Sequence, residues 1–430
     1  MLQMRPMSEI HHTIDSYHSE FQKAFSEWLP DPPLVAAIVN DNEAAIRGAG
    51  RKTQFLDLPC FAHSIQLAVQ QALKLPEVAH LLDRVRTLIR LFCKSPLRMD
   101  KLHLVLKNDG EKEVQVLSWS KTRWGSLLVA LRRLIDLRYA ILQIRDDEDI
   151  ALARDAICEQ EWGELTEMCK ILKPVETISQ SQGGQKYPTL SSCLILLRHG
   201  LKKLKNPLGS ETETVKKFRE TLREALKTKV KWNDEEATFI IMAMMLDPRY
   251  RNYRTCQPII DCNPQSASSL WSLAKKELIV RVSKCIRTIE PSTEETVSCI
   301  PPEPIDEDID EDPWSEMECR KARPIQPIQP TFIGNRAKEA VERYLDGRSI
   351  PMRDQNGDFQ DIFTWWKVEE HKFPYVAMVA RTVLAVPASS VPSERVFSKA
   401  GELLSKQRLR MTAETADLQL FLHYNKERMK

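Results

Sequence analysis

The chain has 430 residues, and its 62 lysines and arginines are nearly balanced by 60 aspartates and glutamates, so the formal net charge is +2. This length accommodates two or three domains, and the near-zero charge gives no nucleic-acid signal by itself. Ten cysteines without a Cys-x2-Cys pair exclude a regular disulfide framework and favour free thiols in a reducing compartment. No window is apolar over the roughly 18 to 20 residues of a membrane span. We therefore expect a soluble intracellular protein without a membrane partner.

The near-neutral total conceals an uneven distribution of charge. Residues 303–318 contain nine acids and no lysine or arginine, and the rest of the chain has 62 basic residues against 51 acidic ones. That remainder is moderately basic, which is compatible with phosphate binding. Residues 301–330 also contain seven prolines. Such a segment cannot form a packed core, and we interpret it as a disordered acidic linker.

The N-terminal part predicts a helix, a strand and a second helix. Apolar residues recur three, four or seven apart over residues 8–29, which is typical of an amphipathic helix. The continuously apolar run 34–39 predicts a strand buried on both faces. Asp41 follows that strand and precedes a helix-like segment at 43–46. Many α/β folds place chemistry at such a strand end, but Asp41 or its neighbour Asn42 would equally serve as the cap of the next helix.

A Cys-x2-His pair, Cys60 and His63, comes next along the chain. A structural zinc site needs four ligands, and no second pair of ligands stands nearby, so we predict no metal site. A buried cysteine beside a histidine at a helix start is the structural alternative to a functional pair.

From about residue 75 to residue 300 the hydrophobic pattern is overwhelmingly helical. Arg123 and Trp124 precede one apolar stripe, and a lone tryptophan on such a helix is usually part of the core. Residues 198–231 hold eleven lysines and arginines against four glutamates. This stretch is either a solvated helix surface or a basic face for phosphates.

The last hundred residues carry a dense set of motifs. They are Trp365-Trp366-Lys367, Phe373-Pro374, Pro387-Ala388-Ser389-Ser390, Ser393-Glu394-Arg395-Val396-Phe397-Ser398 and Leu418-Gln419-Leu420-Phe421-Leu422. Ser390 or Ser393 predicts a helix N-cap with Pro392 in the first turn, and Glu394 falls where the helix dipole favours an anion. Thr412 predicts the cap of a last helix with an apolar stripe.

These motifs closely resemble the C-terminal dimerisation region of hAT-family transposases and of the host proteins descended from them. The resemblance implies self-association as a homodimer or a higher homo-oligomer. It marks six residues for dimerisation: Trp365, Trp366, Phe397, Leu418, Phe421 and Leu422. The alternative is that the C-terminal stripe completes the core of its own chain. We expect both, with the surplus apolar surface around Phe421 and Leu422 paired between subunits.

The resemblance also extends to the fold. It implies an RNase H-like fold interrupted by a large all-helical insertion, so we expect a mainly α chain with a small, incomplete α/β part. The expected units are a partial RNase H-like segment (1–74), a helical insertion domain (75–300), the acidic proline-rich linker (301–330) and the dimerisation region (331–430).

The same resemblance assigns roles to the polar motifs. Asp41 matches the second and Glu394 the third of three catalytic carboxylates, which in this family hold two divalent metal ions. Cys60 and His63 are placed on the DNA side of the active site. Arg123 is expected to contact phosphate, and Trp124 to stack on an unpaired base.

The first catalytic carboxylate belongs to a strand upstream of the helix near residue 11, where this chain starts. Asp15 lies on that helix, the wrong element to substitute, and no BED-type zinc finger precedes it. We therefore expect Asp41 and Glu394 to be vestigial, with no enzyme activity, cofactor or small-molecule substrate. The expected function is that of a domesticated nuclear protein in DNA binding or transcription regulation. The alternative is a fragment or isoform of an active transposase that uses Mg²⁺.

Overall fold

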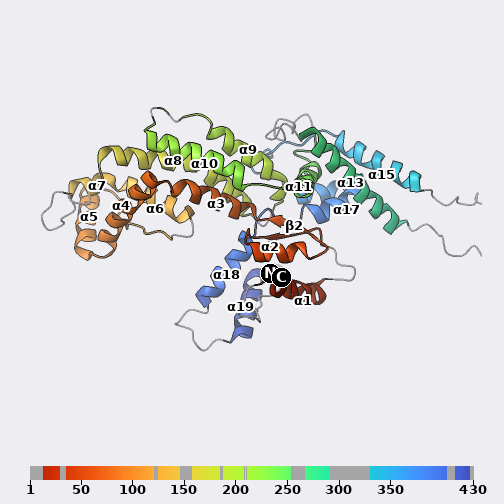
Figure 1. The fold of residues 1–430 in the computed structure, drawn as a ribbon, viewed down its shortest axis with the longest axis horizontal. Coiled ribbons are helices and arrows are strands. Elements are labelled where there is room, and N and C mark those ends of the chain that lie inside the picture. The colour runs from red at the N-terminus through yellow and green to blue at the C-terminus, as the bar shows by residue number, and fades with distance from the viewer. Residues whose placement is uncertain are drawn as a thin grey trace, which may run out of the picture.

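The fold is mainly helical and contains one small parallel sheet (Figure 1). The computed structural model describes residues 13–29, 35–120, 124–145, 157–184, 187–207, 209, 211–252, 267–290, 330–403 and 412–426. The predicted class, mainly α with a small α/β part, is confirmed. None of the described helices is long and apolar enough to cross a membrane.

The sheet consists of β1 (Ala37–Asn40) and β2 (Leu56–Pro59), which pair in parallel from Ala37 opposite Leu56 to Asn40 opposite Pro59. Helix α2 (Ala44–Arg51) connects them, as a parallel pair requires a crossover. The prediction of a strand buried on both faces is wrong for the described residues of that run. Residues 37–39 are only partly buried, because the sheet described here has just two strands and each is an edge strand.

Helices make up the rest of the fold. Along the chain they are α1 (Ile14–Trp28), α3 (Phe61–Leu73), α4 (Pro76–Cys93), α5 (Pro96–Asn108), α6 (Trp124–Asp136), α7 (Arg138–Gln143), α8 (Glu159–Gln182), the short 3₁₀ helix η2 (Leu190–Ser192), α9 (Cys193–Lys203), α10 (Glu213–Lys229), α11 (Asp234–Leu246), α13 (Ala267–Ile289), α15 (Pro330–Leu345), α16 (Ile362–Glu369), α17 (Pro374–Val383), α18 (Val391–Leu403) and α19 (Ala413–Asn425).

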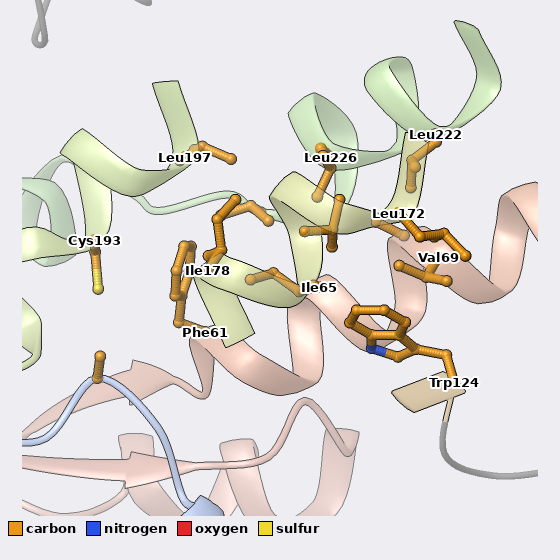
Figure 2. Close-up of a cluster of buried hydrophobic side chains, with 14 of the residues drawn as sticks. Phe61, Ile65, Val69, Trp124, Leu172, Ile178, Cys193, Leu197, Leu222 and Leu226 are labelled. Atoms are coloured by element: carbon orange, nitrogen blue, oxygen red, sulfur yellow. The ribbon is translucent and has the colours of Figure 1, made fainter. Parts of the chain in front are cut away.

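One group of helices forms an arm that extends from the sheet. Helix α3 leaves the end of β2 and packs against α10, and α8 contacts both helices (Figure 1). The core between them contains Phe61, Ile65 and Val69 of α3, with Leu172 of α8 and Leu222 of α10 (Figure 2). The apolar stripe of α4 is buried along its whole length, from Val78 to Phe92, which confirms its periodicity.

A second group of helices lies on the other side of the sheet. Helix α13 packs against α11, α15 and α17 and buries one side of its surface. Helices α18 and α19 form a separate hairpin that projects from the molecule below the sheet in Figure 1, on the same side as α1. Thr412 caps α19 as predicted, since its side chain accepts a hydrogen bond from the Thr415 amide.

The proposed acidic linker falls almost entirely on residues 301–329, which lie outside the described part of the chain. Helix α15 begins at Pro330, the last residue of the predicted linker. The four domain boundaries stay predictions.

Candidate functional site at the strand ends

The carboxyl end of the sheet meets the start of α3. The Cys60 amide donates to the carbonyl of Asn40, the last residue of β1, at 2.6 Å. Asn42 reaches the same helix, because its side-chain amide donates to the Ser64 hydroxyl at 2.8 Å. The polar residues that follow β1 are therefore tied to the first turn of α3.

Asp41 lies in this turn and is partly exposed. Its Oδ1 accepts a hydrogen bond from the Glu43 amide at 3.1 Å, which orders the entry into α2. Glu43 itself occupies the N-cap position without a side-chain bond. The local geometry is thus that of a turn-forming aspartate that lies two residues before the N-cap of α2, so the predicted helix cap is wrong for Asp41. A catalytic role for Asp41 stays a prediction.

Residues 387–390, which we term the clamped loop, cross the same end of the sheet. The Phe61 amide at the start of α3 donates to the Ala388 carbonyl at 3.0 Å. In turn, the Ala388 amide donates to the hydroxyl of Thr189 at 2.9 Å. Ala388 is thereby held on both sides by segments that are remote in sequence.

The second half of the clamped loop is held in the same way. The buried Ser389 hydroxyl donates to the Gln182 carbonyl at the end of α8, at 2.9 Å. The Ser390 amide approaches the sulfur of Cys60 at 3.3 Å. The Pro-Ala-Ser-Ser motif therefore joins the sheet edge, the helical arm and the C-terminal helices at one point.

Cys60 is a buried thiol at the N-cap of α3, and its sulfur also accepts from the His63 amide at 3.4 Å. The His63 ring is partly exposed. Their arrangement is the buried cysteine and helix-start histidine foreseen as one alternative. No three metal-binding side chains gather anywhere in the described ranges. Contact of Cys60 and His63 with DNA stays a prediction.

Glu394 lies in the helix that directly follows the clamped loop along the chain. Helix α18 begins at Val391, with Pro392 and Glu394 in its first turn, as the sequence predicts. The Glu394 amide donates to the Ser390 carbonyl at 3.1 Å, and its carboxylate is exposed. Asp41 and Glu394 thus lie on two segments that both leave the carboxyl end of the sheet.

A buried ionic network supports this end of the sheet from beneath. Arg47 of α2 pairs with Asp57 of β2 and with Glu236 of α11, each at 2.7 Å. Asn40 donates its side-chain amide to Asp57 Oδ1 at 2.8 Å. Burial raises the pKa of Asp57, against the lowering effects of Arg47 and Asn40. Nothing in the residue spacing predicts this network. Its one visible signal is a charged residue between Leu56 and Leu58 in a short apolar run.

Trp124 is buried at the start of α6 and packs near Val69 (Figure 2). This is the core position usual for a lone tryptophan. Stacking of Trp124 on a base requires the ring to leave that core, and the role stays a prediction. Arg123 lies outside the described residues.

Trp366 lies in the core of its own chain. Its ring is 7% exposed, stacks on Tyr344 at 5.2 Å, and donates its Nε1 hydrogen to the Leu246 carbonyl at 3.0 Å. A role for Trp366 in dimerisation stays a prediction. Trp365 is partly buried beside it, with the Arg251 guanidinium 5.5 Å from its ring. The tryptophan pair therefore fastens α16 to α11 and α15 within the chain.

The α18–α19 hairpin has the opposite character. Phe397 is 62% exposed, Leu418 58% and Leu422 44%, while Phe421 is partly buried. The side of α19 that faces its own chain carries Ala416 and Leu420 instead. A groove of about 540 Å³ runs between the two helices and is lined by Lys399, Leu403, Gln419, Leu420, Leu422, His423 and Lys426.

Comparison with known protein families gives matches to two regions of this chain. The hAT family C-terminal dimerisation region matches residues 340–425, which include α16 to α19. The chain therefore carries a hAT C-terminal dimerisation region. The ZBED1 RNase-like helical domain matches residues 58–171, from β2 into α8. The two matched regions therefore include the clamped loop and α3, the helix that starts beside it.

Similar proteins include human zinc finger BED domain-containing protein 4, which is 22% identical over 418 residues, or 96% of this chain and 33% of that protein. The putative AC transposase of Zea mays is 22% identical over 84% of this chain and 43% of its own length. Zinc finger BED domain-containing protein RICESLEEPER 2 of rice is 22% identical, with 84% and 48% covered. This hAT relative spans less than half the length of each.

Proposed function

We propose that this hAT relative is a host-adopted protein that self-associates through the α18–α19 hairpin and acts on DNA in the nucleus. The observation that carries the proposal is the exposure of Phe397, Leu418 and Leu422 within the matched dimerisation region. Each large apolar side chain gains about 1.5–3 kcal/mol when it is fully removed from water. A second copy of the hairpin is the occupant that this family region implies.

The apolar residues of the hairpin separate into two sets. Ala416 and Leu420 hold α19 to its own chain, whereas Leu418 and Leu422 lie on another side of the helix. Tyr424 donates its hydroxyl hydrogen to the Arg395 carbonyl at 3.1 Å, which joins the two helices of one copy. Substitutions at the exposed positions therefore test self-association without opening the hairpin.

Light scattering coupled to size exclusion measures the result. We expect the wild-type chain to be a dimer or a larger oligomer at micromolar concentration. The variant that carries both Leu418→Asp and Phe397→Asp should be monomeric. Leu104→Asp is the matched control, because Leu104 is a similarly exposed leucine on α5. A wild-type monomer, or an oligomer that both hairpin substitutions leave intact, contradicts the proposal.

Action on DNA is supported by the moderately basic remainder of the chain and by relatives named as transposases and BED zinc finger proteins. Phosphate-driven binding releases counterions, so the affinity for duplex DNA must fall steeply as salt rises. Fluorescence anisotropy with a labelled duplex at several salt concentrations measures this slope. Binding that is absent at low salt contradicts this part of the proposal. Nuclear localisation is tested separately by imaging the tagged chain.

We propose further that the chain alone does not cleave DNA. Asp41 already orders a turn, and no group of three or more metal-binding side chains occurs within the described residues. The second candidate function is that of one part of a two-metal transposase. It is favoured because the segments that carry Asp41 and Glu394 both leave the carboxyl end of the sheet. DNA cleavage with Mg²⁺ or Mn²⁺ that is lost in Asp41→Asn and Glu394→Gln supports the second candidate and refutes the first.

A further inference from the structure

Helix α13 carries an exposed face on which cations and apolar side chains alternate. We term this the cationic face, and it consists of Leu273, Lys276, Val280, Lys284 and Arg287. At 3.6 residues per turn these five positions fall within an arc of roughly 80°. The opposite side of α13 is buried against its neighbours through Trp271, Ala274, Leu278, Val282 and Ile286. The cationic face is therefore directed away from the core.

Acidic groups close to this face are already engaged elsewhere. Glu277 borders it and accepts from Arg281 at 2.8 Å. Glu290 at the end of α13 accepts from Arg336 of α15 at 2.7 Å. Within the described ranges, no ion pair involves the three cations of the face. Three like charges on one stripe repel one another, so a complementary anion stabilises them.

We propose that the acidic segment 303–318 of the same chain docks on the cationic face. The segment has nine acids and no lysine or arginine, against three cations on the face. It also contains Ile305, Ile309, Trp314 and Met317 between the acids. These apolar residues suit Leu273 and Val280, which are 45% and 47% exposed. The segment therefore contains both charges opposite to those of the face and apolar residues like those of the face.

The stretches of chain on both sides of the acidic segment start next to the cationic face. The Glu290–Arg336 pair holds the end of α13 beside the first turns of α15, and the chain between these helices includes 303–318. The residues from 291 to 302 reach up to roughly 40 Å when extended, whereas the face is about 21 Å long from Leu273 to Arg287. Such a tether gives an effective concentration in the millimolar range, so weak contacts suffice for docking.

Residues 253–266 also adjoin α13, at its other end, and are the competing segment of the chain. They contain one aspartate and one arginine. Charge complementarity therefore selects residues 303–318 over them.

Carbodiimide coupling of the full chain tests the docking, because it joins only carboxylates and amines in direct contact. We expect amide links from residues 303–318 to Lys276 and Lys284 at low salt, and a fall of about ten-fold in 0.5 M NaCl as screening increases. Lys202 and Lys203 of α9 are matched controls, since both are exposed. Equal coupling of the acidic segment to all four lysines overturns the proposal.

Mixing ¹⁴N- and ¹⁵N-labelled chains identifies which copy supplies the segment. Links within one isotope class support docking in the same chain, and hybrid links assign the segment to a second copy and overturn it. In a variant with all nine acids changed to Asn or Gln, acetylation of Lys276 and Lys284 should rise roughly two-fold or more. Unchanged reactivity of these lysines overturns the proposal, and protection that requires added duplex DNA identifies nucleic acid as the occupant instead.

Discussion

Replacement of Arg47 by methionine should destabilise the sheet edge because two buried carboxylates lose their common cation. Arg47 lies 2.7 Å from both Asp57 and Glu236, and the side chains of these partners are 3% and 5% exposed. Methionine retains much of the aliphatic packing of arginine, so the change isolates the charge. Removal of one partner from a buried ion pair costs about 3–5 kcal/mol, because the remaining charge is left uncompensated.

Hydrogen exchange measured by mass spectrometry is the suitable assay, since it reports local opening in a chain with several parts. A loss of 3–5 kcal/mol corresponds to a fall in protection of roughly 10² to 10³·⁵-fold. The effect should concentrate in β1, β2, α2 and the start of α11. Helix α4, which lies away from the network in the helical arm, serves as the internal control.

Two further results decide whether charge is the cause. The triple variant Arg47→Met, Asp57→Asn, Glu236→Gln should recover most of the protection, because no unpaired charge remains. In the single variant the folded-state pKa of Asp57 rises further above its unfolded value, so protection should increase as pH falls. A single variant within about two-fold of wild type, a range far below 3 kcal/mol, would falsify the reasoning. A triple variant as weak as the single one would assign the loss to packing.

Two other predictions follow from contacts in the same structure. A Cβ added at Gly50 meets Asp57 Oδ1 at 2.6 Å, so Gly50→Ala should lower the stability by about 1–3 kcal/mol. A Cβ added at Gly163 on α8 meets no atom within 4 Å, so Gly163→Ala should raise the stability by up to about 1 kcal/mol. Thermal unfolding of both variants measures the two changes. Hydrogen bonds from Arg336 and a tyrosine lower the pKa of Glu290 from 4.5 to about 2. Its folded pKa is depressed, so its stabilisation is present above pH 4.5 and lost as pH falls toward 2. Glu290→Gln should remove this pH dependence from the unfolding curve, and a variant curve parallel to wild type contradicts the assignment.

Local patterns in the sequence predicted much of the fold. The stripe of α4 and the cap of α19 follow from residue spacing and capping chemistry, which act over a few residues. The start of α18 at Val391 follows from the same rules. The C-terminal motifs also indicated the hAT relationship that the family comparison shows. The RNase H-like character of the small α/β part stays a proposal.

Partners that are distant in sequence could not be predicted in this way. Arg47 and Glu236 are separated by 189 positions, and no periodicity links them. An aromatic motif likewise does not reveal whether its side chains pack in the core of their own chain or stay exposed. Trp366 is buried in its own chain and Phe397 is exposed, although both belong to one family region. Burial depends on the packing of whole helices, which spacing along one helix does not contain.

The clamped loop has a consequence for the order in which the chain folds. Its contact between Ser390 and Cys60 spans 330 positions, and the contact with Thr189 spans 199. Contacts of such long range form late and slow the overall folding rate. At a synthesis rate of about 5–20 residues per second, Cys60 leaves the ribosome tens of seconds before Ser390. During that interval the carboxyl end of the nascent sheet lacks its cover and is open to a chaperone.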